Sequence, residues 1–210
     1  MADDDHVQRI VDLAGWHGPR APRLDWPAIE AALGHPLPSD YKRLCERLPP
    51  GGFGEFLNLL HPASVGDFGN LITGERSLKQ PGGIVDMLVE QERIYTEEAN
   101  ARRLTTVEPA AEDGEKWRPL FGPGQLHPCF WTDNGGYGFW IAAKSDPEEW
   151  TIGVNLRSGN DVEPYELSLS SFLHEMLTDE YAFRDFFGAD GPDGVVFEPY
   201  ESGVRQLPPP

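Results

Sequence analysis

Apolar and polar positions repeat at helical spacing through residues 25–48 and predict two short helices. Asp25 can cap the first helix, and Gly34 is suited to end it. A Pro-Ser-Asp segment at 38–40 begins the second helix, and the Pro-Pro-Gly-Gly run at 49–52 ends it. Each helix therefore presents one apolar face to a core, and the two faces consist of Trp26, Ile29 and Leu33, then Leu37, Tyr41, Leu44, Cys45 and Leu48.

Four more elements of the N-terminal half follow from the same patterns. Residues 3–14 predict a helix, and residues 53–60, apolar on both faces, predict one strand in the interior of a sheet. The loop after Pro62 could include a short strand at 71–73. The longest helix is predicted over 83–103, where four glutamates form either a solvated face or part of an acidic docking surface: Glu90, Glu92, Glu97 and Glu98.

The second half of the chain predicts successive strands joined by turns. The Asn134-Gly135 dipeptide between two apolar runs is a strong hairpin signal, and short connections favour antiparallel neighbours. Strands in a run, with helices before and after them, predict an α+β fold: a single domain with a central, mostly antiparallel sheet of about five to six strands flanked by helices. The predicted strands are 117–121, 127–132, 137–143, 150–155, 162–167 and 195–197, and the predicted late helices run from Ser170 or Ser171 to Leu177 and from Asp179 to Gly188.

Composition divides the chain into three parts. Residues 1–20 are interpreted as an N-terminal helical extension, because a loop rich in Gly, Pro and Arg separates them from the next helix. Residues 21–188 form the α+β domain. Residues 189–210 are a Gly- and Pro-rich C-terminal tail.

Three motifs in fixed order carry a family resemblance. The first is a Trp that opens a helix with the pattern IE..LG..LP, followed by DYK.L and a Gly-rich turn into a strand that ends in Pro; the matching residues are Trp26, Ile29, Glu30, Leu33, Gly34, Leu37, Pro38, Asp40, Tyr41, Lys42, Leu44, Gly52 and Pro62. The second is a hairpin run with Pro119, Gly122, Gly124, Trp131, Gly136, Tyr137, Phe139 and Trp140, and the third is the helix start Ser170, Ser171, Phe172 and Leu173. Over roughly residues 20 to 180 the chain resembles the SUKH superfamily, a domain shared by a fungal cell-wall-assembly regulator and many bacterial immunity proteins.

The resemblance implies a function in protein binding. Bacterial members of the family commonly bind and block a toxin, so we expect an immunity protein that occludes the basic active-site cleft of a nuclease or deaminase toxin. The alternatives are a general regulatory or interaction module without a toxin partner, as the fungal member suggests, and a small-molecule-binding or enzymatic domain. In many relatives an acidic Gly-Asp pair lies near the central turn, whereas this chain has Gly135-Gly136 there, with Asp133 just before them.

The charge of the chain narrows the choice of partner. Its 210 residues include 17 Lys and Arg against 35 Asp and Glu, a formal net charge of −18. Such a surface disfavours direct binding to nucleic acid or to an anionic membrane, and it favours a basic protein partner, such as a toxin domain. The chain has no apolar run of membrane-spanning length and begins with an acidic segment, so we expect a cytoplasmic protein, as a monomer or weak dimer.

The sequence contains no recognisable catalytic or metal-binding motif. The six histidines lack helical ligand spacing, and neither Cys45 nor Cys129 belongs to a CxxC pair. Neither a phosphate-binding loop nor a nucleophile elbow is present. We therefore predict a protein without catalytic residues, metal or cofactor.

The candidate partner-binding residues lie in and after the central hairpin. Most aromatic residues there are expected in the core, but Trp131 and Trp140 would be binding anchors if they face outward. Asp133 and Asn134 at the hairpin tip would then form a polar rim. The carboxylates Asp146, Glu148 and Glu149 complete the predicted partner-binding set.

Overall fold

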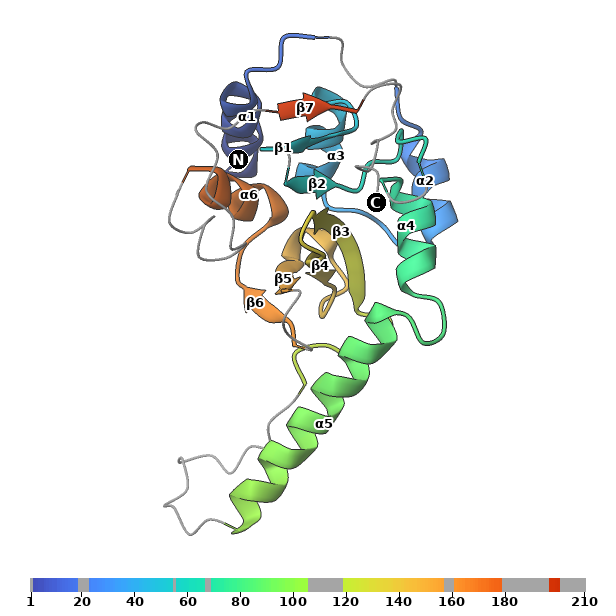
Figure 1. The fold of residues 1–210 in the computed structure, drawn as a ribbon, viewed down its shortest axis with the longest axis vertical. Coiled ribbons are helices and arrows are strands. Elements are labelled where there is room, and N and C mark those ends of the chain that lie inside the picture. Colours follow the sequence, from blue (N-terminus) through green and yellow to red (C-terminus); the bar gives the residue numbers. More distant parts are fainter. Residues whose placement is uncertain are drawn as a thin grey trace.

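The fold is a single α+β domain, as the pattern of elements predicts (Figure 1). Its described residues form six helices and a seven-stranded antiparallel sheet, slightly more strands than the five to six expected. The computed structural model describes residues 2–18, 23–54, 56–66, 69–105, 119–156, 161–178 and 197–200. Within these ranges the helices are α1 (Ala2–Ala14), α2 (Trp26–Leu33), α3 (Ser39–Arg47), α4 (Leu71–Leu78), α5 (Ile84–Thr105) and α6 (Leu169–Thr178). The strands are β1 (Gly51–Phe53), β2 (Leu57–Leu59), β3 (Leu126–Thr132), β4 (Tyr137–Ile141), β5 (Thr151–Asn155), β6 (Glu163–Tyr165) and β7 (Phe197–Pro199), and a 3-10 turn, η1, spans Pro147–Glu149.

The strands follow the order β6-β5-β4-β3-β2-β1-β7, so the predicted hairpin of β3 and β4 lies at the centre. Trp131 pairs with Tyr137 next to the turn, and the register shifts between Pro128 and Phe130. This irregularity is a β-bulge, which bends the strand and adds twist. At one edge, β7 pairs antiparallel with β1, so two segments far apart in the sequence lie side by side.

The prediction of one strand over 53–60 is wrong, because the segment is a tight hairpin of β1 and β2. Phe53 pairs with Leu57, and the chain reverses at Gly54, whose φ of +59° suits glycine. The apolar run indicated burial correctly, since every residue of both strands is buried. It could not distinguish one long interior strand from two short ones.

The prediction of a strand at 71–73 is also wrong, because these residues form the first turn of α4. The side chain of Asn70 accepts hydrogen bonds from the backbone N–H groups of Ile72 and Thr73 and so caps the helix. Residues 119–121 of the predicted strand 117–121 also lie outside any strand. Residues 117–118, the predicted helix 179–188 and residues 195–196 lie outside the described part of the chain, and the late strand begins at Phe197.

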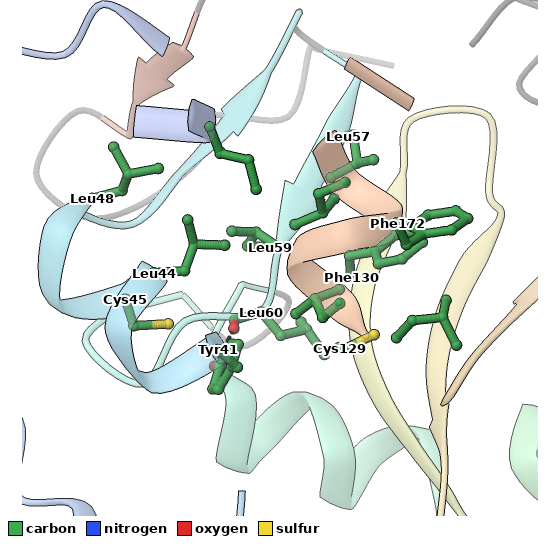
Figure 2. Packing of buried hydrophobic residues seen from close by; sticks show 14 of the residues in the cluster. Tyr41, Leu44, Cys45, Leu48, Leu57, Leu59, Leu60, Cys129, Phe130 and Phe172 are labelled. Carbon is green, nitrogen blue, oxygen red and sulfur yellow. Dashed lines mark hydrogen bonds between the residues drawn. The ribbon is translucent and has the colours of Figure 1, made fainter. Parts of the chain in front are cut away.

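The main core lies between the sheet and the helices α1, α2, α3 and α6. Figure 2 shows side chains of α3 directed toward Leu59, Leu60 and Phe130 of the sheet region, with Phe172 of α6 beside them. The buried hydroxyl of Tyr41 donates to the carbonyl oxygen of Leu60 over 2.5 Å, which satisfies both groups.

Helix α1 belongs to this same core through Val7, Ile10 and Ala14, which are all buried. It packs against α3 and α6. The domain boundary proposed at residue 20 stays a prediction, but the apolar face expected for residues 3–14 is in place.

A smaller hydrophobic cluster occupies the opposite face of the sheet. Alternation along β4 directs Trp140 into the main core and Phe139 and Ile141 into this small cluster, where Val85 and Leu88 of α5 cover them. Only the first turns of α5 are anchored in this way, and the rest of the helix extends away from the body (Figure 1). No helix in the described ranges is long and apolar enough to span a lipid bilayer.

Candidate functional site

The two tryptophans predicted as binding anchors have different surroundings. Trp131 is partly exposed on β3. Trp140 is 1% exposed, and its ring packs edge-on against Tyr41 with a centroid distance of 4.9 Å. Trp140 therefore does not meet the condition set for a binding anchor, that it face outward, because the period of two along β4 places it on the core face.

The polar residues of the hairpin tip mainly hold the hairpin together. Asp133 accepts a hydrogen bond from the side-chain amide of Asn58 over 2.9 Å. Asn134 accepts from the hydroxyl of Thr132 over 2.6 Å. Both side chains thus have structural partners, and their predicted role as a binding rim stays a prediction.

The three carboxylates after β4 lie at the other end of that strand from the hairpin tip. Asp146 caps η1 by accepting from the backbone N–H of Glu148. Glu148 accepts from the backbone N–H and the hydroxyl of Ser39 over 2.8 and 2.7 Å, which caps α3 from another element. Glu149 pairs with Lys144 over 3.1 Å. The predicted partner-binding set is therefore split between two ends of β4 rather than gathered in one patch.

A buried polar cluster, which the sequence analysis missed, joins three separate elements. It consists of His35 from the turn after α2, Glu75 and Lys79 from α4 and the residue after it, and His127 from β3. Gly34, at φ +81°, ends α2 and redirects the chain just before His35. The cap at Asn70 sets the start of α4 and hence the position of Glu75.

The carboxylate of Glu75 is the centre of this cluster. The Nε2 atom of His35 lies 3.0 and 3.1 Å from its two oxygens, and the Nδ1 atom of His127 lies 3.0 Å from Oε1. The Nζ atom of Lys79 lies 2.5 Å from the same Oε1 and 2.7 Å from Nδ1 of His127. The three side chains His35, Glu75 and His127 each direct a metal-ligating atom to one place, with all three atoms within 4.8 Å of one another.

Neighbouring groups fix the orientation of both imidazole rings. The Nδ1 atom of His35 lies 2.9 Å from the carbonyl oxygen of Pro36, which can only accept, so Nδ1 carries a proton. The ring of His127 stacks on Trp150 at an interplanar angle of 3°. The two imidazole centroids are 3.8 Å apart. The cluster is thus pre-arranged before anything binds to it.

Burial and hydrogen bonding have opposite effects on the charge of Glu75. Burial alone raises the pKa of the carboxyl, but its side-chain hydrogen bonds with His127 and His35 and the charge of Lys79 outweigh it, so the pKa of Glu75 lies well below its ordinary value. Burial, followed by the charges of Lys79 and His35, lowers the pKa of His127 against the opposing effect of Glu75. A charged carboxylate beside the weakly basic imidazole of His127 is an arrangement that can hold a cation.

The exposed part of α5 is a second candidate site. Met87 and Tyr95 are 53% and 50% exposed, and Ile94 between them is partly exposed. Positions i, i+7 and i+8 share one side of a helix, so these three side chains form one apolar strip. Glu90 and Glu97 lie beside the strip and bind Arg93 over 2.6 and 2.5 Å. We call Met87, Ile94 and Tyr95 the α5 strip.

The chain matches no family model, no curated protein and no solved structure. The SUKH resemblance therefore rests on the sequence motifs alone.

Proposed function

We propose that the protein is an immunity protein that binds a bacterial toxin of the nuclease or deaminase type and occludes its basic active-site cleft. It acts in the cytoplasm as a monomer or weak dimer. The proposal combines the SUKH-like motifs with a net charge of −18, which attracts a basic partner and speeds its capture.

The observation that carries the proposal is the exposed α5 strip. Among the described side chains of α5 only Val85 and Leu88 are buried, so the helix contributes little to the core for its length. A helix that presents apolar anchors at i, i+7 and i+8 suits insertion into a groove of a partner. Exposed Tyr and Met side chains flanked by carboxylates supply apolar contact area together with a charged rim.

The hairpin residues favour α5 as the main docking element. Trp140 is buried, and Asp133, Asn134 and Glu148 already accept hydrogen bonds within the domain. A partner at the hairpin would have to compete with these bonds, whereas a partner that contacts the apolar side chains of the α5 strip would not.

Direct binding of toxin domains encoded beside the gene tests the proposal. We expect a basic nuclease or deaminase domain to bind at micromolar concentration or tighter and to bind more weakly as salt rises. Loss of toxin activity in the complex would show occlusion of the cleft. If no such domain binds in low salt, the hypothesis of a toxin partner is rejected. The alternative, a regulatory module without a toxin partner, is then favoured.

Variants of the α5 strip locate the docking element. Tyr95→Ala should weaken binding by on the order of tenfold or more, because exposed Tyr anchors are enriched among residues that dominate binding energy. Val65→Ala is the matched control, since Val65 is 74% exposed but lies outside α5. Equal binding by both variants would reject α5 as the docking element.

A further inference from the structure

We propose that His35, Glu75 and His127 form a binding site for a zinc ion, and that the ammonium group of Lys79 competes with the metal for this place. The inference is independent of partner binding, because it concerns different elements and a different ligand. It is based on the geometry and the hydrogen-bonding capacity of the buried polar cluster.

The distances within the cluster approach those of a tetrahedral metal site. Two nitrogen or oxygen ligands on one zinc ion at ordinary bond lengths are about 3.3 Å apart. Nε2 of His35 and Nδ1 of His127 each lie 3.0 Å from Oε1 of Glu75. A small outward movement of the side chains would therefore admit the ion.

The tautomer of His35 provides the strongest argument for a cation. Because its Nδ1 donates to the carbonyl of Pro36, the neutral ring has a lone pair on Nε2. That lone pair faces the two carboxylate oxygens of Glu75, which also only accept. Two acceptors at this distance are stable only with a proton or a metal ion between them.

The position of Lys79 shows that the same place already attracts positive charge. Its Nζ lies within hydrogen-bond distance of both Glu75 and His127, two of the three proposed ligands. The Lys79 side chain is 24% exposed, against 6% for Glu75, so it is the group that can move out to solvent. An entering ion would displace this ammonium group and keep the charge of Glu75 compensated.

The ligand types favour zinc over the hard cations. Two imidazoles and one carboxylate suit zinc and its neighbours in the first transition row, whereas magnesium and calcium prefer oxygen ligands alone. Three protein ligands leave a fourth position for water or another group. The carbonyl of Pro36 accepts from His35 and orients its ring, as hydrogen-bond partners of metal-ligating imidazoles do.

Titration of the metal-free, full-length protein with zinc chloride, followed by calorimetry and metal analysis, tests the inference. We expect one zinc ion per chain with a dissociation constant of about 1 µM or tighter, and no comparable binding of magnesium. The variant K79M should bind zinc on the order of tenfold more tightly, because it removes a positive charge from the ion's place. Cobalt(II) in place of zinc should give the intense visible absorption of a four-coordinate site.

Histidine variants separate this site from incidental binding. His127→Gln and His35→Gln should each weaken zinc binding by more than about tenfold. The matched control is a double variant, His6→Gln with His174→Gln. These two histidines are another neighbouring pair of imidazoles, with ring centroids 5.3 Å apart. The zinc affinity of the double variant should stay within about twofold of that of the unchanged protein. The Glu75→Gln variant changes a buried side chain, so it is informative only if circular dichroism shows that the variant folds. K79M changes a partly exposed side chain and is expected to fold.

Two results would overturn the inference. The first is a zinc dissociation constant above about 100 µM for both the unchanged protein and K79M. It would mean that a proton, and not a metal ion, lies between the acceptor atoms of the cluster. The other is binding that the His6 and His174 changes abolish but the His127 change does not, which would place zinc at the protein surface.

Discussion

Helices α3 and α5 differ in how many of their side chains are buried. α3 has nine residues and buries four of them, Asp40, Tyr41, Leu44 and Cys45. α5 has 22 residues, yet among its described side chains only Val85 and Leu88 are buried. Most helices in proteins are stabilised by packing of an apolar face, and α3 is such a helix.

The difference shows which helix supports the domain and which provides surface. Asp40 in α3 also accepts from the backbone N–H of Ser170 over 2.8 Å and so joins α3 to the start of α6. Beyond its root, α5 depends on intrinsic helix propensity and on local pairs such as Arg93 with Glu90 and Glu97. The small number of buried side chains on α5 supports the proposal that its surface binds a partner.

Truncation of a buried side chain in α3 should give the largest effect. Leu44→Ala removes a fully buried side chain and should lower the free energy of unfolding by about 3 kcal/mol, because a cavity forms in the main core. Denaturant unfolding measures this value. The paired change Met87→Ala on α5 should cost less than about 0.5 kcal/mol, and similar losses in both variants would remove the contrast between the helices.

Acid should weaken the side of the domain that contains α3. His61 is buried, its Nε2 donates to the carbonyl of Cys45 in α3, and its Nδ1 accepts from the backbone N–H of Ala63. Burial, against the opposing effect of backbone hydrogen bonds with Cys45 and Leu48, lowers the pKa of His61 to about 4. As pH falls from about 6.5 the unfolded chain binds the proton first, so stability is lost down to about pH 4, by about 3 kcal/mol in total.

Unfolding curves of His61→Gln between pH 7 and pH 4 check this prediction. The variant should show a smaller loss over this window than the unchanged protein. The exposed His17→Gln should follow the unchanged protein. If His61→Gln loses stability with falling pH as the unchanged protein does, groups other than His61 cause the acid sensitivity.

The cap of α3 should have a moderate effect. Pro38 precedes α3 and provides no capping side chain, and Glu148 from η1 accepts from Ser39 instead. Glu148→Ala should therefore lower the free energy of unfolding by about 1 kcal/mol, whereas Glu149→Ala, which breaks an exposed ion pair, should cost less than about 0.5 kcal/mol. Thermal unfolding of the two variants compares them, and equal losses would argue against the cap.

A glycine in the exposed part of α5 should have the smallest effect on the whole domain. Gln91→Gly should lower the local stability of α5 by about 1 kcal/mol, because glycine disfavours a helix interior. The exposed part of α5 can unfold locally while the core stays folded. We expect faster amide hydrogen exchange in α5 and an unchanged midpoint of global unfolding. A clear shift of the global midpoint would mean that α5 is coupled to the core as α3 is.

Periodicity predicted most of the fold because burial follows it. The central hairpin, the fold class and the bounds of α2, α3 and α5 agree with the sequence patterns within a few residues. The errors occurred where an apolar run is compatible with two structures. Residues 53–60 conceal a turn at Gly54, and the β-branched pair Ile72-Thr73 obscured the cap at Asn70.

Rules based on sequence spacing could not predict the buried polar cluster. His35 and Glu75 are 40 residues apart, and Glu75 and His127 are 52 apart. The packing of α4 against both β3 and α2 brings them together. The position of Trp140, by contrast, was open to prediction, because Phe139 and Ile141 on the other face of the same strand already required it to face the core.

The pairing of β1 with β7 has a consequence for the growing chain. The strand that covers β1 comes from residues 197–199, and Phe197 also packs edge-on against Phe53 and against Trp16 near the start of the chain. During synthesis the edge of β1 is therefore open until residues 197–199 have left the ribosome, and open edges invite pairing with other chains. Truncated translation products that end before residue 197 should accumulate as aggregates, whereas products that include β7 cover this edge.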